Sequence, residues 1–210
     1  EEGHYSFSLF WQKFTSRAIW DLNCLGGELS CGVAWNSLWM AVLVGATTTL
    51  LGLAFALLVT RTGIQAKAFI RVSSLLPIIT PPFVIGLALI LLFGRSGALN
   101  GFLEWAFGIP PTRWIYGLPG IWLAQTLAFT PIAFLVLIGV VEGVSPSMEE
   151  ASQTLRASHW QTFWTVSLPL MRPGIANAFL LGFIESLADF GNPLVPVSYT
   201  HLRAHETSAY

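Results

Sequence analysis

The sequence contains few charged residues and few cysteines. Only 10% of its 210 residues are Asp, Glu, Lys or Arg, and the formal net charge is −1. Because a nucleic-acid-binding surface needs a clear excess of Lys and Arg, we expect no nucleic-acid partner. The two cysteines, Cys24 and Cys31, precede the first long apolar run. We interpret them as two unpaired thiols, and a disulfide is the alternative if that segment faces an oxidising compartment.

Motifs for catalysis are also missing. The sequence has no G-x-x-x-x-G-K-[ST] loop for ATP phosphates, no G-x-S-x-G nucleophile elbow, and no H-E-x-x-H or paired C-x-x-C motif. Asp189, Phe190 and Gly191 spell the metal-binding triplet of kinases, but no Gly-rich loop or H-R-D sequence accompanies them. An intramembrane aspartyl protease would need two converging aspartates. We therefore predict that the chain is not an enzyme, has no metal ligands and binds no cofactor.

The sequence is instead rich in long apolar runs. Its residues are 54% hydrophobic, and its mean hydropathy is +0.65. An apolar run of about 20 residues is long enough for a helix to cross a bilayer. We therefore predict an all-α polytopic transmembrane helical bundle over residues 33–196, with spans at about 33–59, 72–93, 117–141 and 174–194.

Prolines interrupt two of these spans. Pro77, Pro81 and Pro82 lie in the second span, where each lacks the amide hydrogen that a helix needs, so this helix should kink or break. Pro131 should kink the third span in the same way. Because broken helices often line a transport pathway, Pro81 and Pro82 are candidate pathway residues; a kinked packing helix without function is the alternative.

The two ends of the chain differ from this apolar body. Residues 1–32 mix aromatic and polar side chains, and we expect them to form a periplasmic or interfacial segment. Residues 197–210 are polar and resemble a translated sequencing adapter, so we expect a non-native tail. For that reason we discount the metal-like spacing of His201, His205 and Glu206. Because the chain also opens without a starting Met, we expect a truncated fragment.

Residues 142–173 form a polar segment between the third and fourth spans. Ser145 followed by Pro146 is a typical helix start, because the serine oxygen can accept an unpaired amide hydrogen and proline is tolerated at the first helical position. Ser158 and Gln161 have the spacing of a capping box, which predicts a second helix start about a dozen residues later.

The second short helix has an aromatic face. Trp160, Phe163 and Trp164 recur at helical spacing, and we expect Pro169 and Pro173 to end the helix. An apolar face this short cannot cross a bilayer. The segment therefore predicts a helix-turn-helix that lies at the membrane surface with aromatic rings to bury.

The string EEASQTLRASHWQTFWTVSLPLMRP resembles the EAA loop of permease subunits of ATP-binding-cassette importers. That pattern has Glu-Ala-Ala, a glycine six residues after the Glu, a hydrophobic residue and then Leu-Pro, and Glu150 occupies the first position. Ser152 replaces an alanine of the pattern, and Arg156 replaces its glycine. If the pattern needs a left-handed residue there, an arginine costs about 1 kcal/mol or more.

The resemblance implies half of a type I importer permease, in which this loop forms a pair of coupling helices that docks into a cleft of a cytoplasmic ATPase. The coupling residues that it implies are Glu149, Glu150, Ala151, Arg156, Ala157, Trp160, Phe163, Leu168 and Pro169. From the residues alone, an amphipathic pair lying at the interface is the alternative.

A compact basic loop predicts the orientation. Arg61, Lys67 and Arg71 follow the first span without an intervening carboxylate, which is typical of a cytoplasmic loop. With that loop inside, residues 142–173 lie inside too.

Two carboxylates in the fourth span are candidate pathway residues. Glu185 and Asp189 are four residues apart, which places them on one helix face, and Glu185 should lie near the bilayer centre. We add the nearby Asn192 to this set. The alternative is a structural acid that is hydrogen-bonded between helices.

The string GFIESLADFGNPLV resembles the segment after the EAA loop in ferric-iron importer permeases, which implies iron(III) as the solute. Polyamine, thiamine and phosphonate permeases share the same loop. The implied partners are a cytoplasmic ATPase dimer that binds the ATP, a periplasmic solute-binding protein, a second permease half and the lipid of the bacterial inner membrane. A secondary transporter and a structural membrane subunit are the alternatives of another class.

Overall fold

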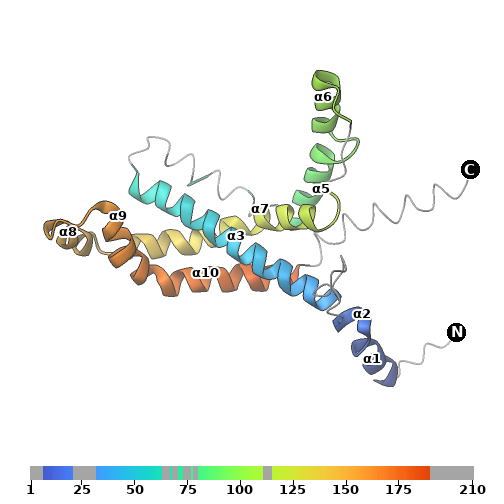
Figure 1. Cartoon of the computed structure of the whole chain (residues 1–210), viewed down its shortest axis with the longest axis horizontal. Helices are drawn as coiled ribbons and strands as arrows, with labels where there is room; N and C mark the ends of the chain where they lie inside the picture. Colours follow the sequence, from blue (N-terminus) through green and yellow to red (C-terminus); the bar gives the residue numbers. More distant parts are fainter. Residues whose placement is uncertain are drawn as a thin grey trace, which may run out of the picture.

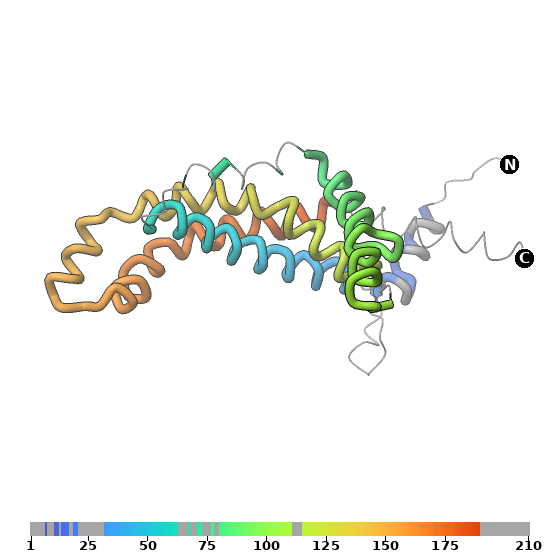
Figure 2. Tube along the Cα trace, turned by 90° about the horizontal axis from the view of Figure 1, so that it is seen from above, coloured from blue at the N-terminus to red at the C-terminus, as the bar shows by residue number. Residues whose placement is uncertain are grey.

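The structure is a computed structural model, and it describes residues 7–20, 32–62, 67, 71–72, 77, 80–110 and 115–189. Within these residues the protein is helical and contains no strand. Helices α3 (Val33–Arg61), α7 (Leu118–Glu142) and α10 (Leu168–Ala188) lie side by side as a bundle (Figures 1 and 2). The predicted all-α architecture is confirmed.

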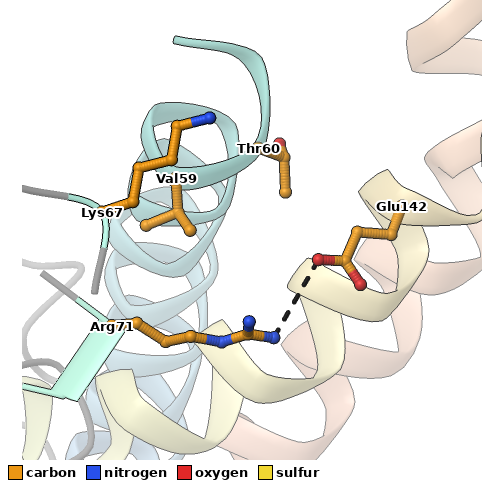
Figure 3. A pocket seen from close by; sticks show the side chains of 5 residues that line it. All are labelled: Val59, Thr60, Lys67, Arg71 and Glu142. Atoms are coloured by element: carbon orange, nitrogen blue, oxygen red, sulfur yellow. Dashed lines mark ion pairs between the residues drawn. The ribbon is translucent and has the colours of Figure 1, made fainter. Parts of the chain in front are cut away.

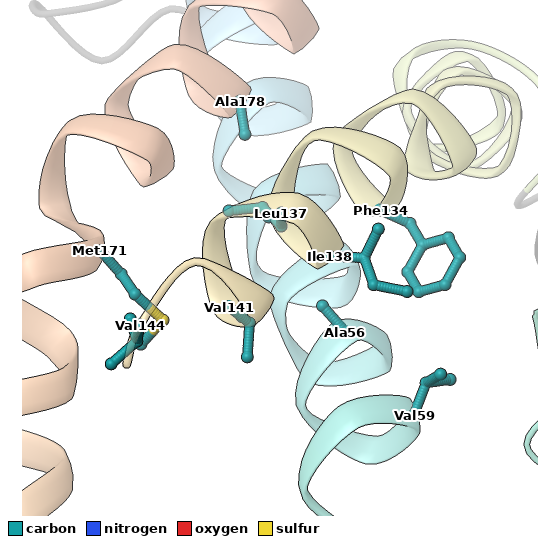
Figure 4. Packing of buried hydrophobic residues seen from close by; sticks show 9 residues of the cluster. All are labelled: Ala56, Val59, Phe134, Leu137, Ile138, Val141, Val144, Met171 and Ala178. Carbon is teal, nitrogen blue, oxygen red and sulfur yellow. The ribbon is translucent and has the colours of Figure 1, made fainter. Parts of the chain in front are cut away.

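Helix α7 is the central element of the bundle. In its apolar stretch 67% of the residues are buried, compared with 39% in the apolar stretch of α3 and 22% in that of the helical run that contains α10. The main apolar cluster joins all three helices and includes Ala56, Phe134, Leu137, Met171 and Ala178 (Figure 4). The exposed apolar residues of these helices are suited to lipid or to another helix, as expected of a membrane bundle.

Small residues allow the helix backbones to approach closely. A Cβ placed on Gly52 of α3 would lie 2.9 Å from the Ala133 carbonyl carbon and 2.9 Å from the Phe134 nitrogen of α7. This contact leaves no room for a side chain. Gly52 therefore fixes how closely α3 packs on α7.

The second predicted span contains helix α5 in its C-terminal half. Helix α5 covers Pro82–Phe93, so its end agrees with the predicted 72–93, and much of the first half of that range lies outside the described residues. Pro81 is extended (φ −57°, ψ 138°) and Pro82 is the first helical residue. The chain therefore breaks at this proline pair, because the residue before a proline avoids the helical region and proline is well suited to begin a helix.

Helix α6 (Ala98–Phe107) follows α5 after a short bend. Both helices turn away from the end of the bundle (Figure 1). Taken together as Pro82–Phe107 they are apolar enough to count as one of four candidate membrane spans within the described residues. Helices α1 (Phe7–Phe14) and α2 (Arg17–Trp20) lie near the same end of α3 and carry exposed aromatic rings.

The fourth span was predicted at 174–194, but α10 begins at Leu168 and ends at Ala188. The expectation that Pro169 and Pro173 end the preceding helix is wrong, since both lie inside a continuous helical run of His159–Ala188. At Pro169 the physical reason is a π-helical turn, η3 (Phe163–Ser167), in which the Leu168 amide donates to the Phe163 carbonyl. This wider turn gives the Pro169 ring room that a regular α-helix would not.

Several predictions lie outside the described residues. These are Cys24, Cys31, Asn192 and the tail at 197–210 with its histidines.

Candidate functional site

The polar segment forms two short helices at one end of the bundle. Helix α8 (Pro146–Thr154) begins where the sequence predicts, with Ser145 as its N-cap residue and Pro146 at its first position. The Ser145 hydroxyl makes no capping hydrogen bond, however, and lies 2.8 Å from Ser147 Oγ instead. Helix α9 (His159–Thr162) begins with a capping box: the Gln161 amide donates to Ser158 Oγ (3.3 Å), and the Ser158 amide donates to Gln161 Oε1 (2.9 Å). We call residues 145–168 the tip; it extends beyond the ends of α3 and α7 (Figures 1 and 2).

Arg156 lies between these helices with φ +64°. It is the one non-glycine residue with positive φ in the described part of the chain. This is the position where the EAA pattern has glycine, so the sequence retains the left-handed turn without the residue that adopts it most easily. The Ala157 amide donates to the Ser152 carbonyl (3.2 Å) and closes the turn.

Three aromatic rings gather on the tip, and two of them are largely exposed. Trp160 and Trp164 pack edge to face with ring centroids 5.5 Å apart, and the Phe163 ring stacks on Trp160 at 6.1 Å. Trp160 is 68% exposed, Trp164 is 51% exposed, and Leu155 in the adjacent turn is 85% exposed. Large apolar side chains gathered on a solvent-facing projection indicate a surface that is covered by a partner or by lipid.

Two neighbouring carboxylates of α8 have different surroundings. Glu149 forms an ion pair with Arg61 at the end of α3 and accepts a hydrogen bond from Ser167 Oγ at 2.6 Å. Glu150 is exposed. The same helix thus presents one carboxylate to the bundle and one outward.

A second polar link joins α8 to α9. The hydroxyl oxygens of Ser152 and Thr162 lie 2.6 Å apart, and Ser152 Oγ also donates to the Glu149 carbonyl (2.9 Å). Thr162 is buried. The serine that replaces an alanine of the EAA pattern therefore holds the two helices of the tip together. Of the coupling candidates beside this link, Ala151 is exposed and Ala157 is half-buried.

A pocket of about 450 Å³ lies beside the end of α3 (Figure 3). Its lining residues are Val59, Thr60, Lys67, Arg71 and Glu142. Arg71 and Glu142 form an ion pair across it at 4.0 Å, with both side chains more than half exposed. The pocket is on the same end of the bundle as the tip, so the basic residues used to predict orientation lie near the predicted coupling segment.

The two candidate pathway carboxylates have different surroundings. Asp189 caps α10 and accepts a hydrogen bond from Gln125 Nε2 of α7 at 3.0 Å, while Ser186 Oγ donates to Gln125 Oε1 at 2.8 Å. Gln125 is fully buried. Glu185 is exposed on the outer surface of α10. Asp189 thus has the interhelical contact that the structural alternative describes, and Pro81 and Pro82 are exposed at the start of α5.

The sequence did not identify three residues at these sites: Arg61, Ser167 and Gln125. Arg61 was used only as a topology signal, and Ser167 has no motif of its own. Gln125 could have been found from the sequence, because it is a glutamine within a long apolar run. A buried amide needs hydrogen-bond partners, so such a residue predicts a polar contact between helices. Within the described residues no group of three or more His, Cys, Asp or Glu side chains comes together.

Known proteins resemble the chain in sequence. Residues 48–199 match the family described as "Binding-protein-dependent transport system inner membrane component". The chain is 46% identical over 188 residues to the "Ferric transport system permease protein FbpB" of Actinobacillus pleuropneumoniae, which covers 90% of this chain and 27% of that protein. It is 32% identical over 168 residues to the "Molybdenum transport system permease protein ModB" of Escherichia coli (strain K12), covering 78% and 72%.

The fold also has solved counterparts. A bacterial ABC transporter for import of the acidic polysaccharide alginate superposes with a TM-score of 0.64, covering 89% of this chain and 63% of that one at 15% identity. This likeness supports the fold. The chain spans about a quarter of the length of the ferric relatives that it matches.

Proposed function

Since this chain belongs to the family of binding-protein-dependent transport system inner membrane components, we propose that it forms part of the translocation pathway of an ATP-binding-cassette importer and couples that pathway to a separate ATPase. It is a multi-pass protein of the inner membrane. The observation that carries the coupling role is the tip, with its exposed Trp160, Trp164 and Leu155 beyond the ends of the membrane helices.

The tip has the features of a docking element for a rigid partner. Its aromatic rings bury a large apolar area when covered, and Trp is the residue type that most often dominates binding energy at protein interfaces. Glu150, exposed beside them, supplies a charge that can fix the orientation of a partner. When ATP closes two ATPase subunits, a docked tip would transmit their relative motion to α10, which continues the helical run of α9 and η3 without a break.

The basic residues support a cytoplasmic position of the tip. Arg61, Lys67 and Arg71 lie at the tip's end of the bundle, and basic loops favour the cytoplasmic side of a membrane. Helices α1, α2 and α6 then lie on the periplasmic side, where a solute-binding protein would deliver the solute.

For the solute we propose iron(III). Two relatives named as ferric transport permeases are 46% and 51% identical to this chain, whereas a molybdenum permease relative is 32% identical. The remainder of the permease would supply the second half of the pathway.

The proposal is tested with Glu150→Lys in the full-length protein. Charge reversal at an exposed docking residue should lower iron(III) uptake and recovery of the ATPase with the permease, while membrane insertion stays intact. Glu104→Lys is the matched control for ATPase recovery and membrane insertion, because Glu104 is an exposed carboxylate on α6 at the opposite end of the bundle. If Glu150→Lys leaves uptake and ATPase recovery unchanged, the coupling assignment is wrong.

A further inference from the structure

Glu149 connects three segments that are far apart in the sequence. Its side chain starts on α8, its Oε2 atom pairs with Arg61 Nη1 at the end of α3, and its Oε1 atom accepts from Ser167 in η3 (2.6 Å). Each carboxylate oxygen therefore has a different partner. The backbone carbonyl of Glu149 also accepts from Ser152, which links α8 to α9.

Besides these contacts, α8 has polar links to α9 from Ser152 to Thr162 (2.6 Å) and from Gln153 to His159 (3.3 Å). None of its residues is buried. Apolar packing therefore does not fix its direction, in contrast to the three membrane helices. The side chain of Glu149 is only 17% exposed and that of Arg61 is 33% exposed, so this pair is better shielded from water than an ordinary surface pair.

A second ion pair at the same end provides the contrast. Arg71 and Glu142 are 4.0 Å apart, and their side chains are 54% and 55% exposed. Glu142 belongs to α7 itself, so its pair does not involve the tip. An exposed pair at this distance contributes little to any fixed geometry.

We propose that Glu149 is a positioning residue, which clamps α8 to the end of α3 and to the π turn so that movement of the tip is passed to the membrane helices. This inference rests on the proposed coupling function. Glu150 and the aromatic rings bind the partner, whereas Glu149 faces the bundle and makes the attachment stiff. Loss of the clamp leaves a tip that still docks but transmits motion poorly.

The test uses the full-length permease with its ATPase and binding protein in proteoliposomes. Glu149→Gln keeps an acceptor for Ser167 but removes the charge that pairs with Arg61. We expect the ATPase to remain bound and the iron(III) uptake per ATP hydrolysed to fall. The fall should be at least about fivefold, which is the factor that corresponds to the smallest typical coupling free energy between two sites. Glu142→Gln, the matched control, should leave this ratio unchanged.

Exchanging the charges of Arg61 and Glu149 tests whether the ion pair itself is required for coupling. In the double variant Arg61→Glu with Glu149→Arg, the ion pair re-forms in reverse, and the guanidinium can donate to Ser167 Oγ. We expect this variant to recover most of the uptake per ATP that Arg61→Glu alone loses. A double variant that transports no better than the single one overturns the proposal.

The mobility of a spin label at position 148 tests the attachment of α8 independently of any transport measurement. Met148 is an exposed residue of α8, one position before Glu149. In a cysteine-free background, Glu149→Gln should increase the mobility of this label, and Glu142→Gln should not. Unchanged mobility and unchanged uptake per ATP in Glu149→Gln contradict the clamp, whereas failure of the wild-type permease to bind the ATPase contradicts the proposed function itself.

Discussion

The three-helix bundle and the tip are held together in opposite ways. In the bundle, apolar side chains from α3, α7 and α10 form one cluster, and Gly52 brings two backbones into contact. In the tip, α8 has no buried residue, and its attachment depends on Glu149 and Ser152. Non-directional packing thus fixes the membrane helices, while a few directional bonds fix the tip and leave its aromatic face exposed for a partner.

The largest effect should come from breaking the packing of the bundle. Gly52→Leu places a side chain where even a Cβ would lie 2.9 Å from the α7 backbone, so α3 and α7 must separate. We expect about 3 kcal/mol of destabilisation, measured by unfolding in detergent or by resistance to proteolysis.

Gly139→Ala sharpens that comparison. Gly139 lies on the exposed side of α7, and a Cβ added there meets no atom within 4 Å. Alanine should be neutral or stabilise the helix by about 0.5–1 kcal/mol. Equal losses for the two glycine variants would contradict a close-approach role for Gly52.

The second largest effect should come from removing the aromatic face of the tip. Replacing Trp160 and Trp164 by alanine should weaken ATPase binding by about 2 kcal/mol or more, because large rings dominate interfaces of this kind. The folded bundle should be unaffected, since both rings are more than half exposed. Affinity is measured by titrating the ATPase onto the full-length permease in nanodiscs. Trp105→Ala is the control, as Trp105 is 84% exposed on α6 at the other end; equal loss in this variant would indicate a general effect of removing tryptophan.

A third, smaller effect concerns the polar contact inside the bundle. Gln125→Leu removes the hydrogen bonds that the Gln125 amide makes to Asp189 and Ser186, and the loss of the acceptor for the buried Ser186 hydroxyl should cost about 1–3 kcal/mol. Glu185→Gln, on the exposed side of α10, should leave stability unchanged. Thermal unfolding of both variants distinguishes a structural role for Asp189 from a shared site with Glu185. If both variants unfold like the wild type, the Gln125 contacts do not stabilise the bundle.

The sequence predicted those parts of the fold that follow from local rules. Long apolar runs located α3 and α7 to within two residues at each end, and serine followed by proline located the start of α8. Pro169 and Pro173 were misleading, because local rules treat proline as a helix end, and the sequence did not reveal the π turn that accommodates Pro169. The contacts of Glu149 were also beyond local reasoning, since Arg61 is 88 residues away in the chain.

The smallest effect is expected at Arg156. Its φ of +64° costs an L-residue about 1–2 kcal/mol, whereas glycine adopts this conformation without strain. Glycine also makes the unfolded chain more flexible, which offsets about 0.4–1 kcal/mol of that gain. Because the Arg156 side chain is exposed, Arg156→Gly should stabilise the turn by a net amount of about 0.5 kcal/mol. Slower amide exchange in α8 and α9 would report this gain. Arg156→Ala retains the strain and should show no slowing, so slower exchange in both variants would trace the effect to the lost arginine side chain and not to backbone relief.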